Sequence, residues 1–160
     1  MHGRIFQIST QPINKEDFYT NDYFYDNSSD FADYIGNEIE GEERERDIKD
    51  FAADISDVFT LKGKDVLEFK GTDALNDFLK VWVDNIKSAA LDLDTKNILR
   101  LSTLYNIRSL TENTHLASYY RVALEDYGYA SPLADLFIDM ADSLKEGDCL
   151  YVGAVIDYHF

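Results

Sequence analysis

The chain has one cysteine and two prolines in 160 residues, and it has no apolar run as long as a membrane span. The single cysteine, Cys149, excludes an intramolecular disulfide and a cysteine-rich zinc site. The opening residues MHGRIFQIST lack the apolar core of a signal peptide. A reducing compartment suits such a composition, so we expect a cytoplasmic protein.

Basic residues are scarce: the chain has 15 of them against 31 acidic residues, which gives a formal net charge of −16. The charge is uneven, with −10 in residues 1–57, +1 in residues 58–124 and −7 in residues 125–160. A field of this sign repels nucleic acid and anionic membranes and attracts basic surfaces. The sequence therefore predicts no direct binding to nucleic acid or membrane, and favours a basic protein surface as the partner.

Familiar catalytic motifs are missing. No G-x-S-x-G elbow, Walker-A loop or G-x-G-x-x-G turn occurs, and the three histidines (His2, His115 and His159) are isolated from one another in sequence. The segment from Asp92 begins like a calcium loop, but Thr103 falls where a bidentate glutamate is needed. We therefore predict no cofactor and no resident metal ion.

Aromatic residues are plentiful, with ten phenylalanines and eleven tyrosines, so the chain differs from a disordered acidic tail. Its length and its 45% hydrophobic content predict a single globular domain over residues 1–160. Residues 14–42 mix aromatic and acidic side chains without a regular period, which predicts an irregular packed segment with short turns. Exposed tyrosines beside carboxylates there would suit protein binding, although packing onto the core is the simpler interpretation.

Hydrophobic periodicity predicts an α+β fold, in which about five helices pack on a small, mainly antiparallel sheet of about three strands. The first and last strands are natural neighbours in that sheet. In the third helix, Ile98, Leu101, Leu104, Tyr105 and Arg108 share one side. Residues 115–127 fit a helix or a strand, and their spacing favours a helix. The expected strands are 4–9, 65–70 and 149–160, and the expected helices are 43–59, 72–91, one beginning after 94 or 95, 115–127 and 132–146.

Two rows of carboxylates repeat at helical spacing, so that successive side chains would stand one turn, about 5.4 Å, apart. The first row contains Glu43, Asp47, Asp50, Asp54 and Asp57, and the second contains Asp135, Asp139, Asp142 and Glu146. Like charges at this spacing cost a helix about 0.2–0.5 kcal/mol per pair, so the rows suggest a use beyond solubility. They also resemble the ladder of negative charge along a nucleic-acid strand.

Three hypotheses for function follow. The first is an acidic protein-interaction module, an inhibitor or nucleic-acid mimic that binds a nucleic-acid-binding protein or nuclease through the acidic rows. Small acidic inhibitor proteins share this size and charge, an analogy of electrostatics without a shared motif. The second is a carboxylate-based or metal-assisted hydrolase that uses Asp22, Asp26, Asp30 and Asp33. The third is a structural domain whose acidity serves only solubility.

Overall fold

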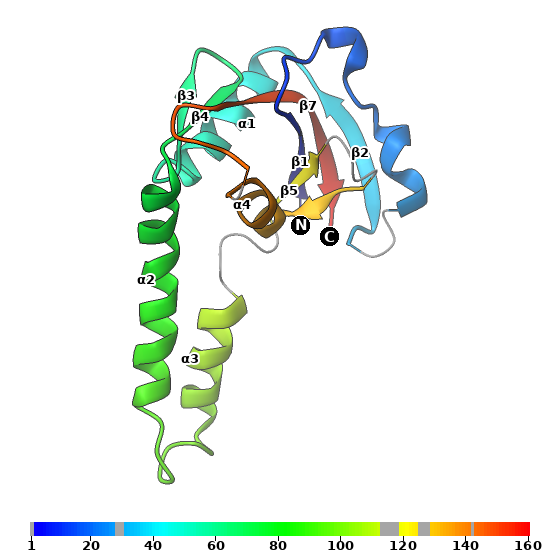
Figure 1. Ribbon diagram of the computed structural model, residues 1–160. Helices are drawn as coiled ribbons and strands as arrows, with labels where there is room; N and C mark the ends of the chain where they lie inside the picture. The colour runs from blue at the N-terminus through cyan, green and yellow to red at the C-terminus, as the bar shows by residue number, and fades with distance from the viewer. Residues whose placement is uncertain (1, 28–30, 113–118, 125–128, 142) are drawn as a thin grey trace.

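The computed structural model describes residues 2–27, 31–112, 119–124, 129–141 and 143–160 (Figure 1). The described residues form one mixed sheet, four α-helices and two short 3-10 helices. The strands are β1 (His2–Ser9), β2 (Tyr34–Ile39), β3 (Phe59–Lys62), β4 (Val66–Phe69), β5 (Tyr120–Leu124), β6 (Ser131–Pro132) and β7 (Cys149–His159). The helices are η1 (Lys15–Asp17), η2 (Asn21–Asn27), α1 (Gly41–Asp54), α2 (Thr72–Leu91), α3 (Leu101–Glu112) and α4 (Leu133–Ala141).

The prediction of about three strands is wrong, because the described chain contributes seven strands to the sheet. Their order is β3-β4-β7-β1-β5-β6, with β2 paired to β7 outside this path. The β1–β5 pair is parallel and the other pairs are antiparallel. The chain is therefore α+β as expected, but with a larger sheet than the sequence pattern indicated.

Strand β7 organises the sheet. One of its edges pairs with β1 from His2 opposite His159 to Ser9 opposite Tyr151, which confirms that the first and last strands are neighbours. Its other edge pairs with β4 at one end and with β2 at the other. The β1–β7 register shifts between Phe6 and Ile8, where β7 carries an extra residue. The bulge lies beside the stretch 152–154 of β7, which on the opposite edge separates the β4 partner from the β2 partner.

The missed strands had weak or ambiguous patterns. Residues 115–127 were predicted to be helical, but Tyr120–Leu124 form β5 and the residues on either side, 113–118 and 125–128, lie outside the described part. Tyr120, Val122 and Leu124 point to one face, an alternation too short to be separated from helical spacing. The helix predicted for 132–146 is likewise shorter, because Ser131 and Pro132 belong to β6 and α4 begins at Leu133.

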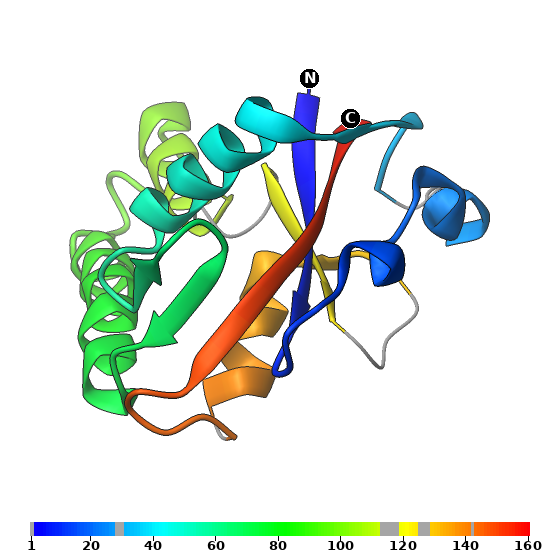
Figure 2. The same cartoon turned by 90° about the horizontal axis from the view of Figure 1, so that it is seen from above.

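The sheet is covered on both faces (Figure 2). On one face, α1 and α4 pack over Phe6, Ile8 and Val155, and the ring of Phe6 stacks on that of Phe51 with centroids 4.3 Å apart. On the other face, Phe24 of η2 packs with Ile35, Ile156 and Tyr158. The segment predicted to be irregular, residues 14–42, therefore supplies the second cover of the sheet in its described part, together with the edge strand β2.

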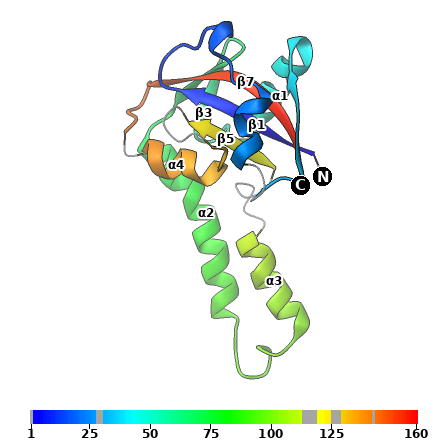
Figure 3. The ribbon, with the colours of Figure 1, turned by 90° about the vertical axis from the view of Figure 1, so that its right-hand side faces the viewer.

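Helices α2 and α3 form a hairpin that projects away from the sheet and its covering helices, which we call the body (Figures 1 and 3). Leu75, at the base, is the one fully buried residue of α2. Phe78, Leu79 and Trp82 pack partly against the body core. Among the described residues, no helix is long and apolar enough to cross a membrane.

Candidate functional site

The first acidic row does not form a free ridge. Helix α1 carries Glu43, Asp47, Asp50 and Asp54 but ends at Asp54, so Asp57 lies in the turn that follows. The Asp54 carboxylate accepts a hydrogen bond of 2.9 Å from the Tyr120 hydroxyl. Glu43, Asp50, Asp54 and Asp57 are exposed, whereas Asp47 is buried. The row therefore combines exposed carboxylates with one that is engaged inside the fold.

Asp47 is the clearest case of an engaged carboxylate. Its side chain is only 10% exposed, and it accepts a 2.6 Å hydrogen bond from Arg4 Nε of β1. Arg4 also donates to Asp157 of β7, whose carboxylate lies 3.0 Å from His2 Nδ1. Burial opposes the charge of Arg4, but the hydrogen bond to Asp47 and the charges of Asp47 and Asp157 outweigh it, so the pKa of Arg4 is raised. Asp47 thus fastens α1 to the sheet.

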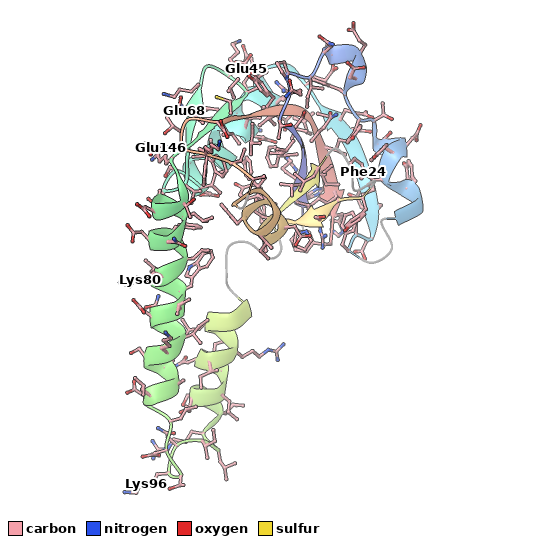
Figure 4. The ribbon with its side chains drawn as sticks, in the orientation of Figure 1. Phe24, Glu45, Glu68, Lys80, Lys96 and Glu146 are labelled. Atoms are coloured by element: carbon pink, nitrogen blue, oxygen red, sulfur yellow. The ribbon has the colours of Figure 1, made fainter. Side chains whose placement is uncertain are left out.

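The second acidic row is divided between separate elements. Asp135 lies half-buried on α4, and its charge acts on the Arg121 guanidinium. Glu146 is exposed in the turn before β7, beyond the end of α4, and lies near the start of α2 in Figure 4. The Asp139 side chain and Asp142 lie outside the described residues. The described members therefore do not continue along one helix face.

The structure contains a groove that the sequence did not reveal. It lies where β2 meets α1, beside the bulge of β7, and has a volume of about 820 Å³. We call it the β2–α1 groove. It is lined by Lys15, Glu16, Phe18, Tyr19, Thr20, Glu38, Ile39, Glu40, Gly41, Arg44, Glu45, Ala154 and Val155.

Four carboxylates surround this groove against two basic side chains, so its lining is acidic. Glu40 lies 3.3 Å from Lys15 Nζ, and Glu45 lies 2.5 Å from Lys64 Nζ. Glu38 accepts a 2.7 Å hydrogen bond from the backbone N–H of Asn21. Glu16, Glu38, Glu40 and Glu45 are all exposed to solvent. The carboxylates of the rim are therefore open to solvent.

Arg44 lines the groove and binds the part of β7 that has no strand partner on that edge. Its guanidinium donates to the backbone carbonyl of Val152 at 2.7 Å and to that of Gly153 at 2.7 and 2.9 Å. These carbonyls lie between the segments of β7 that pair with β4 and β2. Burial lowers the pKa of Arg44, and the charge of Asp65 partly offsets that effect. The Arg44 charge is thus used within the fold.

Two aromatic residues form a wall of the groove, and Gln7 holds that wall in place. Phe18 lies under the Arg44 guanidinium at 5.1 Å. The Gln7 carbonyl accepts hydrogen bonds from the backbone N–H groups of Tyr19 and Ala154, at 3.1 and 3.0 Å, while its amide donates to the carbonyl of Asp17. This buried side chain joins the 14–20 segment to the β7 bulge. The wall is therefore anchored to the sheet.

The carboxylates of the hydrolase hypothesis do not gather in this groove. Neither Asp22 nor Asp33 lines it, and Asp33 lies 3.2 Å from His159 Nδ1 instead. The Asp26 side chain and Asp30 lie outside the described residues. Within the part of the chain that can be described, no group of three or more His, Cys, Asp or Glu side chains is placed to hold a metal ion.

Sequence reasoning missed the groove because its residues come from three separate stretches of the chain, 15–20, 38–45 and 154–155. The acidic–aromatic character of residues 14–42 was the available signal, since Lys15, Phe18, Glu38 and Glu40 all fall in it. Their convergence depends on β2 pairing with β7, and β2 was not predicted. The charged residues of α1 were instead assigned to a helical stripe.

Tyr120, which binds Asp54 of the first row, gives a test by pH. Burial, followed by the hydrogen bond to Asp54, raises the pKa of Tyr120. Above about pH 10 the unfolded chain loses this proton first, so the free energy of unfolding should fall with rising pH, by at most about 1.4 kcal/mol per unit for one proton. Alkaline denaturation should be less steep in Tyr120→Phe than in wild type. The exposed Tyr105→Phe variant should retain the wild-type slope, and equal slopes for all three proteins would contradict the assignment.

Comparison with known protein families, with curated proteins and with solved structures gave no match to this chain.

Proposed function

We propose that the protein is a protein-interaction module that binds a basic segment of another protein in the β2–α1 groove. The observation that carries the proposal is the groove itself, a concave site with aromatic and aliphatic walls and a rim of four exposed carboxylates. Apolar walls bury the stem of a lysine or arginine, and a carboxylate rim binds its charged end. A nucleic-acid-binding protein or nuclease is a partner class with such segments.

Lys15 supports this proposal from within the chain. Its side chain is 77% exposed, yet its ammonium lies 3.3 Å from Glu40 at the edge of the groove. The pair is open to solvent and therefore weak, because exposed ion pairs contribute about 0–1 kcal/mol. A partner cation can replace Lys15 at little cost. The pairing of Glu40 with a lysine ammonium thus supports the proposal that the rim binds basic side chains.

The net charge of −16 supports the same partner class. An acidic surface attracts a basic protein over long range, so association should be fast at low salt. That attraction is screened beyond about 8–10 Å at physiological ionic strength. We therefore expect affinity to fall as salt is raised, chiefly through slower association.

A comparison of two triple variants tests the site. The groove variant carries Glu38→Gln, Glu40→Gln and Glu45→Gln, and the matched control carries Asp50→Asn, Asp57→Asn and Glu146→Gln. Both remove three exposed carboxylates, and the control takes exposed members of the two acidic rows. Binding of a short lysine–arginine peptide should weaken about tenfold or more in the groove variant, a loss of about 1.4 kcal/mol. The control should lose about threefold or less.

Calorimetry with the peptide, followed by capture of partners from cell extract at low salt, measures both variants. Equal losses in the two would mean that net charge alone attracts basic molecules, and the groove proposal would fail. A larger loss of affinity in the control variant would mean that the peptide binds the acidic rows instead of the groove. Wild-type affinity in both variants would mean that these carboxylates do not bind the peptide, and the acidity of the protein would be assigned to solubility.

A further inference from the structure

The projecting hairpin of α2 and α3 exposes apolar side chains that its own packing does not cover. Of the fourteen large hydrophobic side chains that are exposed among the described residues, eight lie between Val81 and Tyr105. Those at the far end and along α3 form what we call the hairpin patch. It consists of Leu91, Ile98, Leu99, Leu101, Leu104 and Tyr105, which are 39–89% exposed.

The part of the patch on α3 has the spacing of a helix side that packs against another surface. Leu101, Leu104 and Tyr105 are spaced i, i+3 and i+4, so they share one side of α3. Leu101 is 84% exposed and Tyr105 is 68% exposed, while Ile107 of the same helix is half-buried. Helix α3 therefore has a second, largely apolar side besides the one that its hairpin partner covers, and the exposed Arg108 shares this side. Several large apolar side chains exposed together on one projecting segment mark a candidate interface.

The charge distribution favours a second copy of this chain as the molecule that binds the hairpin patch. Residues 72–112 hold six acidic and five basic residues, a net charge of −1, whereas the rest of the chain carries −15. Two copies of the protein repel each other through their bodies, but their hairpins are almost neutral and project away from that charge (Figure 4). A basic partner would be attracted to the body instead of this surface. The hairpin is thus the part of the molecule on which a second copy can dock.

The available area suits a small dimer interface. The twenty residues of α2 and the twelve of α3 span about 30 and 18 Å, and each helix is about 10 Å wide. If one whole face of both helices is buried, with the hairpin patch as its apolar part, each chain contributes about 500 Å² and the pair buries about 1,000 Å². That total is the lower limit for a specific protein interface.

We propose that the hairpin patch is a self-association surface through which two copies pair about a two-fold axis, with their hairpins antiparallel. A four-helix bundle results, in which each α3 covers the exposed apolar side of the other. The antiparallel arrangement places the two acidic bodies at opposite ends of the bundle. Both β2–α1 grooves then remain open, because they lie on the bodies.

Sedimentation equilibrium of the wild-type chain between about 1 and 100 µM tests the proposal, over the range in which interfaces of this size associate. The 18.4 kDa chain should sediment with twice its mass at the upper end. Leu101→Ser should weaken association about tenfold or more, because each copy would lose a large apolar side chain from the interface. Ile138→Ser, which alters a 67% exposed residue on α4, is the matched control and should associate like wild type.

Salt separates this surface from the groove. Raising salt should strengthen self-association or leave it unchanged, because it screens repulsion between the bodies, whereas peptide binding in the groove should weaken. Circular dichroism should show folded protein for both variants, because both residues are exposed. A monomeric wild type throughout the range, equal weakening by the two substitutions, or dissociation of the dimer by salt would each overturn the proposal. The first result would leave the patch to a different protein.

Discussion

Replacing Arg4 with methionine is expected to lower the free energy of unfolding by about 3–5 kcal/mol, the loss seen when one partner of a buried ion pair is removed. Arg4 stands between Asp47 and Asp157, whose side chains are only 10% and 17% exposed. Without the guanidinium, two carboxylates face each other near the join of β1, β7 and α1. Urea unfolding monitored by circular dichroism measures the loss.

Arg46→Met is the matched control on α1, since Arg46 also lies 3.3 Å from Asp47 but is 60% exposed. It should cost less than about 1 kcal/mol, as expected for an exposed ion pair. Similar losses of stability in both variants would contradict the role given to Arg4.

Replacing Arg44 with methionine should lower the free energy of unfolding by about 2–4 kcal/mol. The backbone carbonyls of Val152 and Gly153 would lose their donors, and each unsatisfied buried acceptor costs about 1–3 kcal/mol. Arg44→Lys should recover part of the loss, because one ammonium donates from a single point where the guanidinium spans both carbonyls. Thermal unfolding of the two variants and wild type gives the comparison.

A neighbour on the same helix serves as the control. Lys49 of α1 is exposed, so Lys49→Met removes a charge of the same sign without uncovering a carbonyl. It should unfold within about 0.5 kcal/mol of wild type, as surface substitutions usually do. The proposed role of Arg44 would be wrong if Arg44→Met were as stable as Lys49→Met.

Long, strongly patterned elements could be predicted from the sequence. The strands at 4–9 and 149–160 appear as β1 and β7, and the helix at 72–91 matches α2. The missed strands β2, β3 and β6 each bury a single side chain, such as Ile35 of β2, whereas β5 buries four of its five but is too short for its alternation to be separated from helical spacing. The pairing of β2 with β7 and of β5 with β1 also depends on distant residues.

The candidate site was less predictable than the fold. The helical spacing of the acidic residues of α1 was recognised. Spacing alone does not predict which of these carboxylates forms an ion pair with a basic side chain of the sheet. Asp47 lies over Arg4, 43 residues earlier in the chain, and that encounter follows from packing α1 on β1. The groove likewise depends on three stretches of the chain that meet only in the folded protein.

The position of β7 in the chain has a kinetic consequence. This last strand pairs with β1, β2 and β4, so the middle of the sheet cannot close until residues 149–159 have been synthesised. Its pairing with β1 joins residues about 150 positions apart, and loop closure over such distances slows folding. During synthesis, the edges of β1 and β4 that pair with β7 stay unpaired until β7 has been made. The local contacts between α2 and α3 can form earlier. Chaperone demand during synthesis should therefore concentrate on the sheet.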